Sequence, residues 1–110
     1  MNRLFTYGNL VPGRANEHIL KGIDGTWQKA SIKGILYEKG WGDQMGYPGV
    51  ILDSSASSVE GFIFTSNKLN EKWDFLDDFE GEDYERVVVR AKLLDNNEFV
   101  EAFVYTLKED

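Results

Sequence analysis

The feature that most constrains this fold is a pair of long strand-like stretches, residues 84–94 and 98–106. They are joined by Asp95-Asn96-Asn97, a turn-forming triplet. Every second residue of the first stretch is apolar: Val87, Val89, Ala91 and Leu93. Alternation of this kind is typical of a strand with one face on a core and the other mostly polar. We therefore expect a strand pair whose apolar face is covered by the rest of the chain.

Shorter β-prone stretches precede this pair. They lie at residues 3–7, 26–38, 49–52 and 59–65. The turns between them use glycine more than proline, since the chain has 11 Gly and 2 Pro. One glycine-rich segment, residues 40–49, also carries Trp41 and Tyr47, so it is either a flap over a pocket or a long hairpin loop.

Two helices are expected between the strands. A short one over 15–21 is closed by Gly22. A second, over roughly 68–80, is capped by Ser66 or Asn67 and ended by Gly81. Five or six strands with one or two helices predict a mixed, mostly antiparallel α+β fold, in a single domain over residues 1–110.

Composition narrows the function classes. The chain has 110 residues, of which 42% are apolar and 14% aromatic, which is enough for a core. The absence of cysteine excludes disulfide scaffolds and thiolate nucleophiles, and no spacing of His or acidic residues suggests a metal site. A net charge of −7 disfavours nucleic acid and anionic membranes as partners. No apolar run approaches the ~18 residues of a membrane span, so we expect a cytoplasmic protein.

Glu80 is the strongest candidate for chemistry. At 100° per residue, Trp73, Leu76 and Glu80 all lie within about 40° of Leu69 around the helix. The other nearby acids are predicted to lie off this apolar stripe: Asp74, Asp77, Asp78 and Glu82. Burial of a carboxyl disfavours its charged form, which would raise the pKa of Glu80 toward values suited to general acid and base work. The alternative is an exposed Glu80 in the last helical turn, paired with Arg86 or Arg90.

Further candidates lie on the strands and their loops. Tyr7-Gly8-Asn9-Leu10 follows the first strand, and its backbone N–H groups could form a nest for a carboxylate or an oxyanion, or simply end the strand. Tyr84 and Arg86 share one strand face, where they bind a ligand carboxylate or face solvent. Tyr105 shares a face with Phe103 and could offer its hydroxyl to a pocket or place it at the rim of the core.

Two segments together resemble a known family. They are Leu4-Phe5-Thr6-Tyr7-Gly8-Asn9-Leu10 and Leu76-Asp77-Asp78-Phe79-Glu80-Gly81-Glu82-Asp83-Tyr84-Glu85-Arg86. Their order and spacing are similar to the Tyr-Gly-x-Leu and Leu-Asp-x-x-Glu-Gly-x-x-Tyr-x-Arg motifs of the γ-glutamylcyclotransferase-like superfamily. Intervening strands also resemble that family, so the similarity covers nearly the whole chain.

The resemblance implies a small, mostly antiparallel β-barrel with helices and a reaction that needs no cofactor. In such enzymes the α-amino group of a γ-glutamyl unit attacks its own γ-carbonyl, which forms 5-oxoproline and releases an amine. The implied general acid and base is Glu80, and the implied substrate-binding residues are Tyr7, Gly8, Asn9, Leu10, Arg86 and Tyr105. Asn9 stands where many relatives have Ser or Thr, which leaves a backbone nest possible.

Three questions stay open at this point. Arg86 could orient Glu80 or fix the start of its strand instead of touching substrate. The protein could be a non-catalytic module of the same fold that binds a small ligand, because fold does not determine function. It could also hydrolyse an amide, in which case free glutamate would appear instead of 5-oxoproline. The sequence indicates no oligomeric state.

Overall fold

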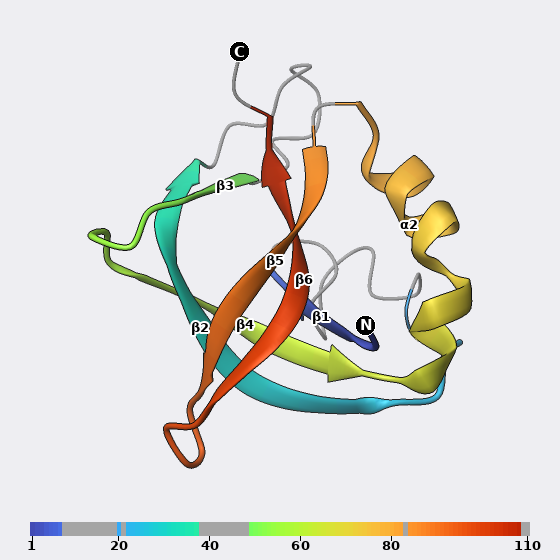
Figure 1. The fold of residues 1–110 in the computed structure, drawn as a ribbon, viewed down its shortest axis with the longest axis horizontal. Helices are drawn as coiled ribbons and strands as arrows, with labels where there is room; N and C mark the ends of the chain where they lie inside the picture. The colour runs from blue at the N-terminus through green and yellow to red at the C-terminus, as the bar shows by residue number, and fades with distance from the viewer. Residues whose placement is uncertain (8–19, 21, 38–48, 83, 109–110) are drawn as a thin grey trace.

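The sheet of this protein closes on itself. The computed structural model describes residues 1–7, 20, 22–37, 49–82 and 84–108. Within these residues the strands are β1 (Arg3–Thr6), β2 (Thr26–Tyr37), β3 (Gly49–Leu52), β4 (Ser58–Thr65), β5 (Tyr84–Leu93) and β6 (Phe99–Leu107). They pair in the order β1-β4-β2-β3-β6-β5, and additional pairings of β1 with β6 and of β2 with β5 close the barrel (Figure 1).

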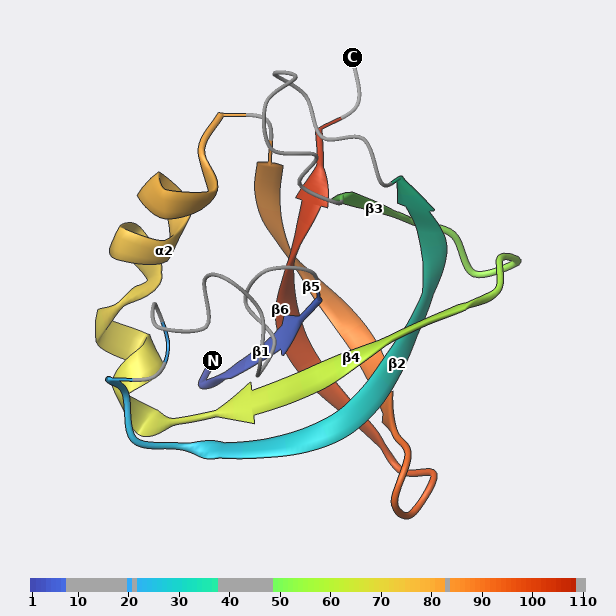
Figure 2. The ribbon, with the colours of Figure 1, turned by 180° about the vertical axis from the view of Figure 1, so that it is seen from behind.

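Most pairings are antiparallel. The two exceptions among the described strands are parallel contacts of β6, one with β1 and one with β3. The view from behind shows β4 and β2 running side by side across the barrel (Figure 2). The expectation of a small, mixed, mostly antiparallel α+β barrel is therefore confirmed.

The β5–β6 hairpin matches the alternation in the sequence. It pairs from Tyr84 with Leu107 to Lys92 with Phe99. At the turn, the backbone N–H of Leu93 donates to the carbonyl of Glu98 at 2.8 Å, and Asn97 takes a φ of 61°. Asparagine is one of the few residues other than glycine that tolerates this left-handed backbone. The predicted strand bounds are correct to within one residue.

Two apolar cores lie on opposite faces of the barrel wall. The first fills the barrel and consists of the buried residues Phe5, Ala30, Ile32, Val50, Val59, Ile63, Ala91, Leu93, Ala102 and Val104. The second lies between the wall and the helices and consists of Leu4, Leu20, Phe64, Leu69, Leu76 and Tyr105. Strand residues alternate between the two cores, as the period of two along a strand requires.

The predicted helix over 68–80 is two elements. A 3-10 helix, η2 (Asn67–Glu71), precedes the α-helix α2 (Trp73–Glu80), which lies along one side of the barrel (Figure 1). The Ser66 hydroxyl caps η2 by accepting from the Lys68 N–H at 3.1 Å. The side chains of Asn67 and Asn70 bind Asn2 and the N-terminal amine instead of supporting a continuous helix. Asparagine is a poor interior helix residue, so the expected single helix breaks here.

Gly81 ends α2 as predicted. It takes a φ of 88°, and its N–H donates to the Asp77 carbonyl at 3.1 Å. The described helices include none that is both long and apolar enough to cross a membrane. The predicted helix over 15–21, except Leu20, and the glycine-rich segment 40–49, except Gly49, lie outside the described residues.

Candidate functional site

Four of the predicted site residues are described by the structure, and they come from four elements. Tyr7 directly follows β1, Glu80 is the last residue of α2, Arg86 lies in β5 and Tyr105 lies in β6. Gly8, Asn9 and Leu10 lie outside the described residues.

Tyr7 is held between two strands of the barrel. Its hydroxyl donates to the backbone carbonyl of Tyr105 and accepts from the Val50 N–H at 3.1 Å. Its ring stacks against Phe5, with 6.3 Å between ring centroids. Burial raises the pKa of the Tyr7 hydroxyl, and the nearby charge of Glu80 raises it further. The hydroxyl therefore stays protonated and acts as a hydrogen-bond donor.

Glu80 is half-buried at the end of α2. Burial raises the pKa of its carboxyl from the ordinary 4.5 to about 7. The cause is loss of hydration, which penalises the charged form. At neutral pH the group is therefore divided between its two protonation states, which is the condition in which a carboxyl can both accept and donate a proton.

Glu80 does not form the surface ion pair with Arg86 or Arg90 that the sequence left as an alternative. Arg86 pairs with Asp77, with 3.4 Å between Arg86 Nε and Asp77 Oδ1, and Arg90 lies 4.8 Å over the ring of Phe99. Within the described part of the chain, Glu80 itself forms no ion pair.

Asp77 is a residue whose place the sequence analysis predicted wrongly. It was placed off the apolar stripe of the helix, but it faces the sheet and is partly buried. The Tyr105 hydroxyl donates to Asp77 Oδ1 at 2.7 Å, and this oxygen is the same one that faces Arg86. At 100° per residue Asp77 is only about 40° from Trp73, so the stripe was drawn too narrowly. The usable signal was its spacing of three from Glu80, which puts both side chains on one helix face.

The guanidinium of Arg86 contacts two aromatic rings. Its guanidinium carbon lies 4.9 Å from the ring centre of Trp73 and 4.6 Å from that of Phe103. The two rings meet edge to face, with 4.9 Å between their centres. Stacking on aromatic faces suits a planar guanidinium. Arg86 therefore ties α2 to β6 from its position on β5.

Tyr105 uses both of its polar groups. Its hydroxyl binds Asp77 on the helix side, and its backbone carbonyl binds Tyr7. Burial raises the pKa of its hydroxyl, and the hydrogen bond to Asp77 adds to this effect. The side chain is only 4% exposed, so its hydroxyl lies in the second core.

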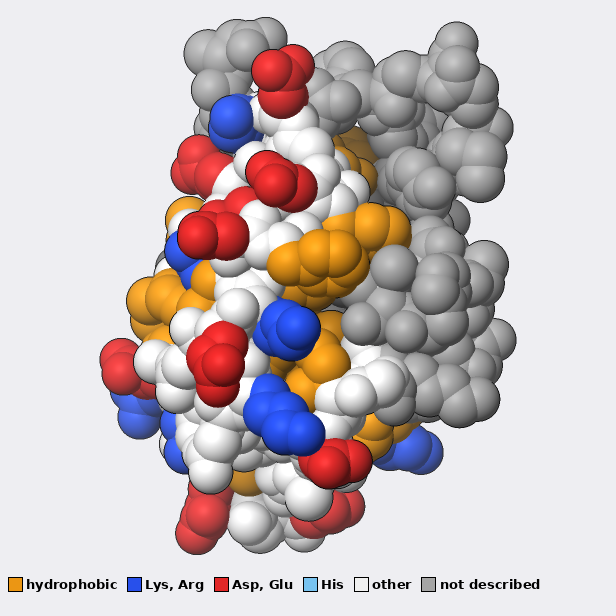
Figure 3. Space-filling view, turned by 90° about the vertical axis from the view of Figure 1, so that its right-hand side faces the viewer, with side chains coloured by type: hydrophobic (Ala, Val, Ile, Leu, Met, Phe, Trp, Pro, Cys, Tyr) orange, Lys and Arg blue, Asp and Glu red, His pale blue; other side chains and the backbone are white. Residues whose placement is uncertain are grey.

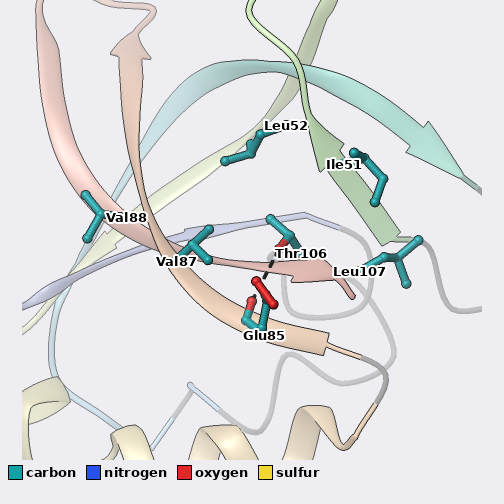
Figure 4. Close-up of a pocket in the computed structure, with 7 residues that line it drawn as sticks. All are labelled: Ile51, Leu52, Glu85, Val87, Val88, Thr106 and Leu107. Atoms are coloured by element: carbon teal, nitrogen blue, oxygen red, sulfur yellow. Dashed lines mark hydrogen bonds between the residues drawn. The ribbon is translucent and has the colours of Figure 1, made fainter. Parts of the chain in front are cut away.

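A separate pocket of about 360 Å³ opens where β3, β5 and β6 meet (Figure 4). It is lined by Ile51, Leu52, Glu85, Val87, Val88, Thr106 and Leu107. Most of these lining residues are aliphatic, but polar atoms make up more of the wall surface than apolar atoms do, and Glu85 is the one ionisable side chain among them. Neither Glu80 nor Tyr7 lines it.

The helix side of the molecule carries acidic and apolar side chains next to each other (Figure 3). On α2, the exposed residues include Phe75, Phe79, Asp74 and Asp78. The side chain of Arg86 is 25% exposed, and that of Asp77, also on α2, is 41% exposed.

Comparison with known proteins identifies the family. The family model described as gamma-glutamyl cyclotransferase, AIG2-like, matches residues 4–110. The chain belongs to this family. Its barrel, with one helix along the side, is the fold of γ-glutamylcyclotransferase-like proteins, which confirms the resemblance found in the sequence. No curated protein sequence matches the chain.

Solved structures share this γ-glutamylcyclotransferase-like fold. An AIG2-like protein from Mus musculus is 23% identical with a TM-score of 0.74, over 96% of this chain and 76% of the mouse chain. YkqA from Bacillus subtilis is also 23% identical with a TM-score of 0.74, but this chain, covered to 97%, spans only 36% of it. A protein described as gamma-glutamyl cyclotransferase is 18% identical with a TM-score of 0.73, over 98% and 67% of the two chains. At these identities the likeness establishes the fold.

Proposed function

We propose that this protein converts a γ-glutamyl amide into 5-oxoproline and a free amine, with Glu80 as the general acid and base. The observation that carries the proposal is the half-buried carboxyl of Glu80, because burial raises the pKa of Glu80 to about 7 and its charge is near enough to raise the pKa of Tyr7. Membership of the gamma-glutamyl cyclotransferase, AIG2-like family supports the reaction class.

The reaction is an intramolecular aminolysis. The α-amino nitrogen forms a bond to the γ-carbonyl carbon, and the carbonyl oxygen takes up negative charge in a tetrahedral intermediate. When the carbonyl re-forms, the bond from this carbon to the original amide nitrogen breaks. Nucleophile and electrophile already belong to one molecule, so the enzyme has to hold the folded rotamer and move protons.

Glu80 carries out two proton transfers in this scheme. The carboxylate accepts one proton from the α-ammonium group, which frees the amine to attack, and the resulting carboxylic acid donates this proton to the departing nitrogen as its C–N bond breaks. The second proton that the α-nitrogen loses in becoming the lactam N–H passes to solvent, from which the released amine takes up a proton. A pKa near the working pH makes neither transfer by Glu80 strongly uphill. The segment Tyr7-Gly8-Asn9-Leu10 is assigned to the substrate carboxylate or the developing oxyanion, which backbone N–H groups stabilise.

The test is product formation from a panel of γ-glutamyl amino acids, γ-glutamyl amines and γ-glutamyl-ε-lysine, read by mass spectrometry. We expect 5-oxoproline from at least one class, and a loss of about 10²- to 10⁴-fold in Glu80→Gln. Glu82→Gln is the matched control, because Glu82 is exposed two residues further on. Free glutamate in place of 5-oxoproline would identify a hydrolase, and no product from any member would overturn the proposal.

A non-catalytic binding module is the second candidate. The pocket between β3, β5 and β6 favours it, because a largely polar wall with the carboxylate of Glu85 fits a small amine (Figure 4). Binding of a panel member with no turnover, abolished by Glu85→Gln and unaffected by Glu80→Gln, would support this function. Turnover that depends on Glu80 would exclude it.

A further inference from the structure

The last turn of α2 is anchored through one side chain. Asp77 accepts from the Tyr105 hydroxyl at 2.7 Å and faces Arg86 Nε at 3.4 Å, while its backbone carbonyl accepts the Gly81 N–H at 3.1 Å. Glu80 lies between Asp77 and Gly81 in the chain. Asp77 therefore holds the last turn of α2, from which the Glu80 side chain extends, against the sheet.

Such an anchor is needed because α2 would not be stable as an isolated helix. It has 8 residues, carries Asp74 in its first turn and has no basic residue in its last turn. Isolated helices of this length are unstable in water, and acidic groups near a helix C-terminus oppose its dipole. Arg86 supplies from β5 the cation that the last turn lacks.

The anchor also connects α2, which carries Glu80, to Tyr7. Tyr105 binds Asp77 through its hydroxyl and Tyr7 through its backbone carbonyl, and Tyr7 in turn accepts from Val50. This chain of hydrogen bonds runs from α2 through β6 to the end of β1 and β3. It couples the two sides of the proposed active site through one residue of the barrel wall.

We propose that Asp77 is a positioning residue, which with Tyr105 and Arg86 fixes the Glu80 carboxyl relative to Tyr7 and keeps water from it. This inference rests on the proposed function for its kinetic consequence. Tyr105 and Arg86 thereby act on Glu80 through Asp77 instead of contacting substrate. Among the described residues, the charged and titratable groups facing this region are Tyr7 after β1, Tyr105 from β6, and Arg86 with Tyr84 from β5.

Asp77→Asn is the main test. The amide oxygen can still accept from Tyr105, but the charge that faces Arg86 is lost. We expect kcat on the best γ-glutamyl substrate to fall about 10- to 100-fold with a smaller change in KM, since misplacement of a reacting group by about 1 Å costs up to about 10²-fold. Hydration of Glu80 should also move the acid limb of the kcat/KM profile downward, from about pH 7 toward the ordinary pKa of 4.5.

Asp78→Asn is the matched control. It makes the same change of charge at the next residue of α2, where the side chain is exposed and has no polar partner among the described residues. We expect its kcat, KM and pH profile to equal those of the wild type. An equal effect of the two substitutions would show a general charge effect and would overturn the proposal.

A second measurement does not depend on activity. The titration of the Glu80 carboxyl carbon is followed by NMR on protein labelled with ¹³C-glutamate, and its signal is assigned by its loss in Glu80→Gln. The Glu80 midpoint should fall in Asp77→Asn and stay unchanged in Asp78→Asn. If no panel member gives 5-oxoproline in the wild type, the proposed function fails, while this titration still decides the role of Asp77.

A purely structural role makes a different prediction. Asp77→Asn would then lower Tm while the Glu80 midpoint and kcat stay at wild-type values, and this result would overturn the proposal. If Asp77→Asn does not fold, Tyr105→Phe takes its place, because it removes only the hydroxyl and leaves the pair of Asp77 with Arg86. An unchanged Glu80 midpoint in a folded Tyr105→Phe would also overturn it.

Discussion

The barrel interior and the seam between α2 and the sheet are built from different kinds of side chain. The core that fills the barrel consists of apolar side chains, and they come from strands whose alternation is visible in the sequence. The seam combines apolar residues with the contacts of Asp77, Tyr105 and Arg86. An apolar interior needs only the right pattern and volume, whereas a polar seam needs each group to meet its partner.

The barrel core contributes mainly to the stability of the fold, whereas the seam carries the carboxyl proposed for the reaction. The first core holds the strands together through apolar contacts, and its buried residues among those described include no ionisable side chain. The seam carries the one carboxyl among the described residues whose pKa is raised to about 7. Substitutions in the two regions should therefore differ in the size and in the pH dependence of their effect on stability.

Phe5→Ala should have the largest effect on stability. Phe5 is 1% exposed inside the barrel, and its replacement leaves a cavity that costs about 3 to 5 kcal/mol. Urea unfolding followed by tryptophan fluorescence measures this cost. Phe75→Ala is the control, because that side chain is 54% exposed on α2 and should change stability by less than about 0.5 kcal/mol. Similar costs for both would remove the distinction between interior and surface.

A pair of glycine substitutions compares the wall of the barrel with the end of the helix. A Cβ at Gly61 would lie 2.1 Å from the backbone carbonyl oxygen of Thr6, so Gly61→Ala must push β1 from β4 and should cost about 3 kcal/mol or more. A Cβ at Gly81 meets nothing within 4 Å, so Gly81→Ala costs only the strain of its φ of 88°, about 1 to 2 kcal/mol. Urea midpoints give both values, and the reverse order would contradict the tight β1–β4 pairing.

Glu80→Gln tests the seam through the pH dependence of stability. Folding raises the pKa of this carboxyl from 4.5 to about 7, so its contribution to stability is complete below pH 4.5 and is lost as the pH rises through about 7. The variant should equal the wild type below pH 4.5 and be more stable by about 1 to 3 kcal/mol at pH 8. Urea titrations at several pH values measure the difference. A gain that does not depend on pH would mean that Glu80 is hydrated in the folded protein.

Arg86→Lys should have the smallest effect. Lysine keeps the charge facing Asp77 but loses the planar contacts with the rings of Trp73 and Phe103, worth about 0.5 to 1 kcal/mol. Thermal unfolding checks this, with Arg90→Lys as the control, since Arg90 contacts the single ring of Phe99. A larger loss for Arg90→Lys would place the important stacking contact on the hairpin instead of the seam.

Much of the fold could be predicted from the sequence. The strand bounds, the turn at Asn97 and the end of α2 at Gly81 follow from alternation and from residues that tolerate a positive φ. The break after Glu71 was missed, because the side chains of Asn67 and Asn70 find partners at the N-terminus, far away in sequence. Helix continuity in this stretch is thus a tertiary property.

The candidate site was less predictable. The helical phase of Glu80 and the motif around it pointed to a special carboxyl, but Asp77 was assigned to the wrong face. The bond of Tyr105 to Asp77 and the ion pair of Arg86 with Asp77 were not predicted. Their actual partners depend on contacts that no local pattern contains. The bond between Tyr105 and Asp77 joins residues 28 positions apart, and that between Tyr7 and Tyr105 joins residues 98 positions apart.

The sequence by itself determined where the strands begin and end, where α2 ends and which strand faces are apolar, because these features depend on neighbours a few residues away. Only the tertiary structure decided that Glu80 loses its hydration, that Asp77 meets both Tyr105 and Arg86, and that Tyr7 lies between β3 and β6. The physical reason is that desolvation and hydrogen bonding across the seam depend on how α2 packs against the closed barrel. That packing is set by the register of β5 against β6, in which Arg86 lies opposite Tyr105.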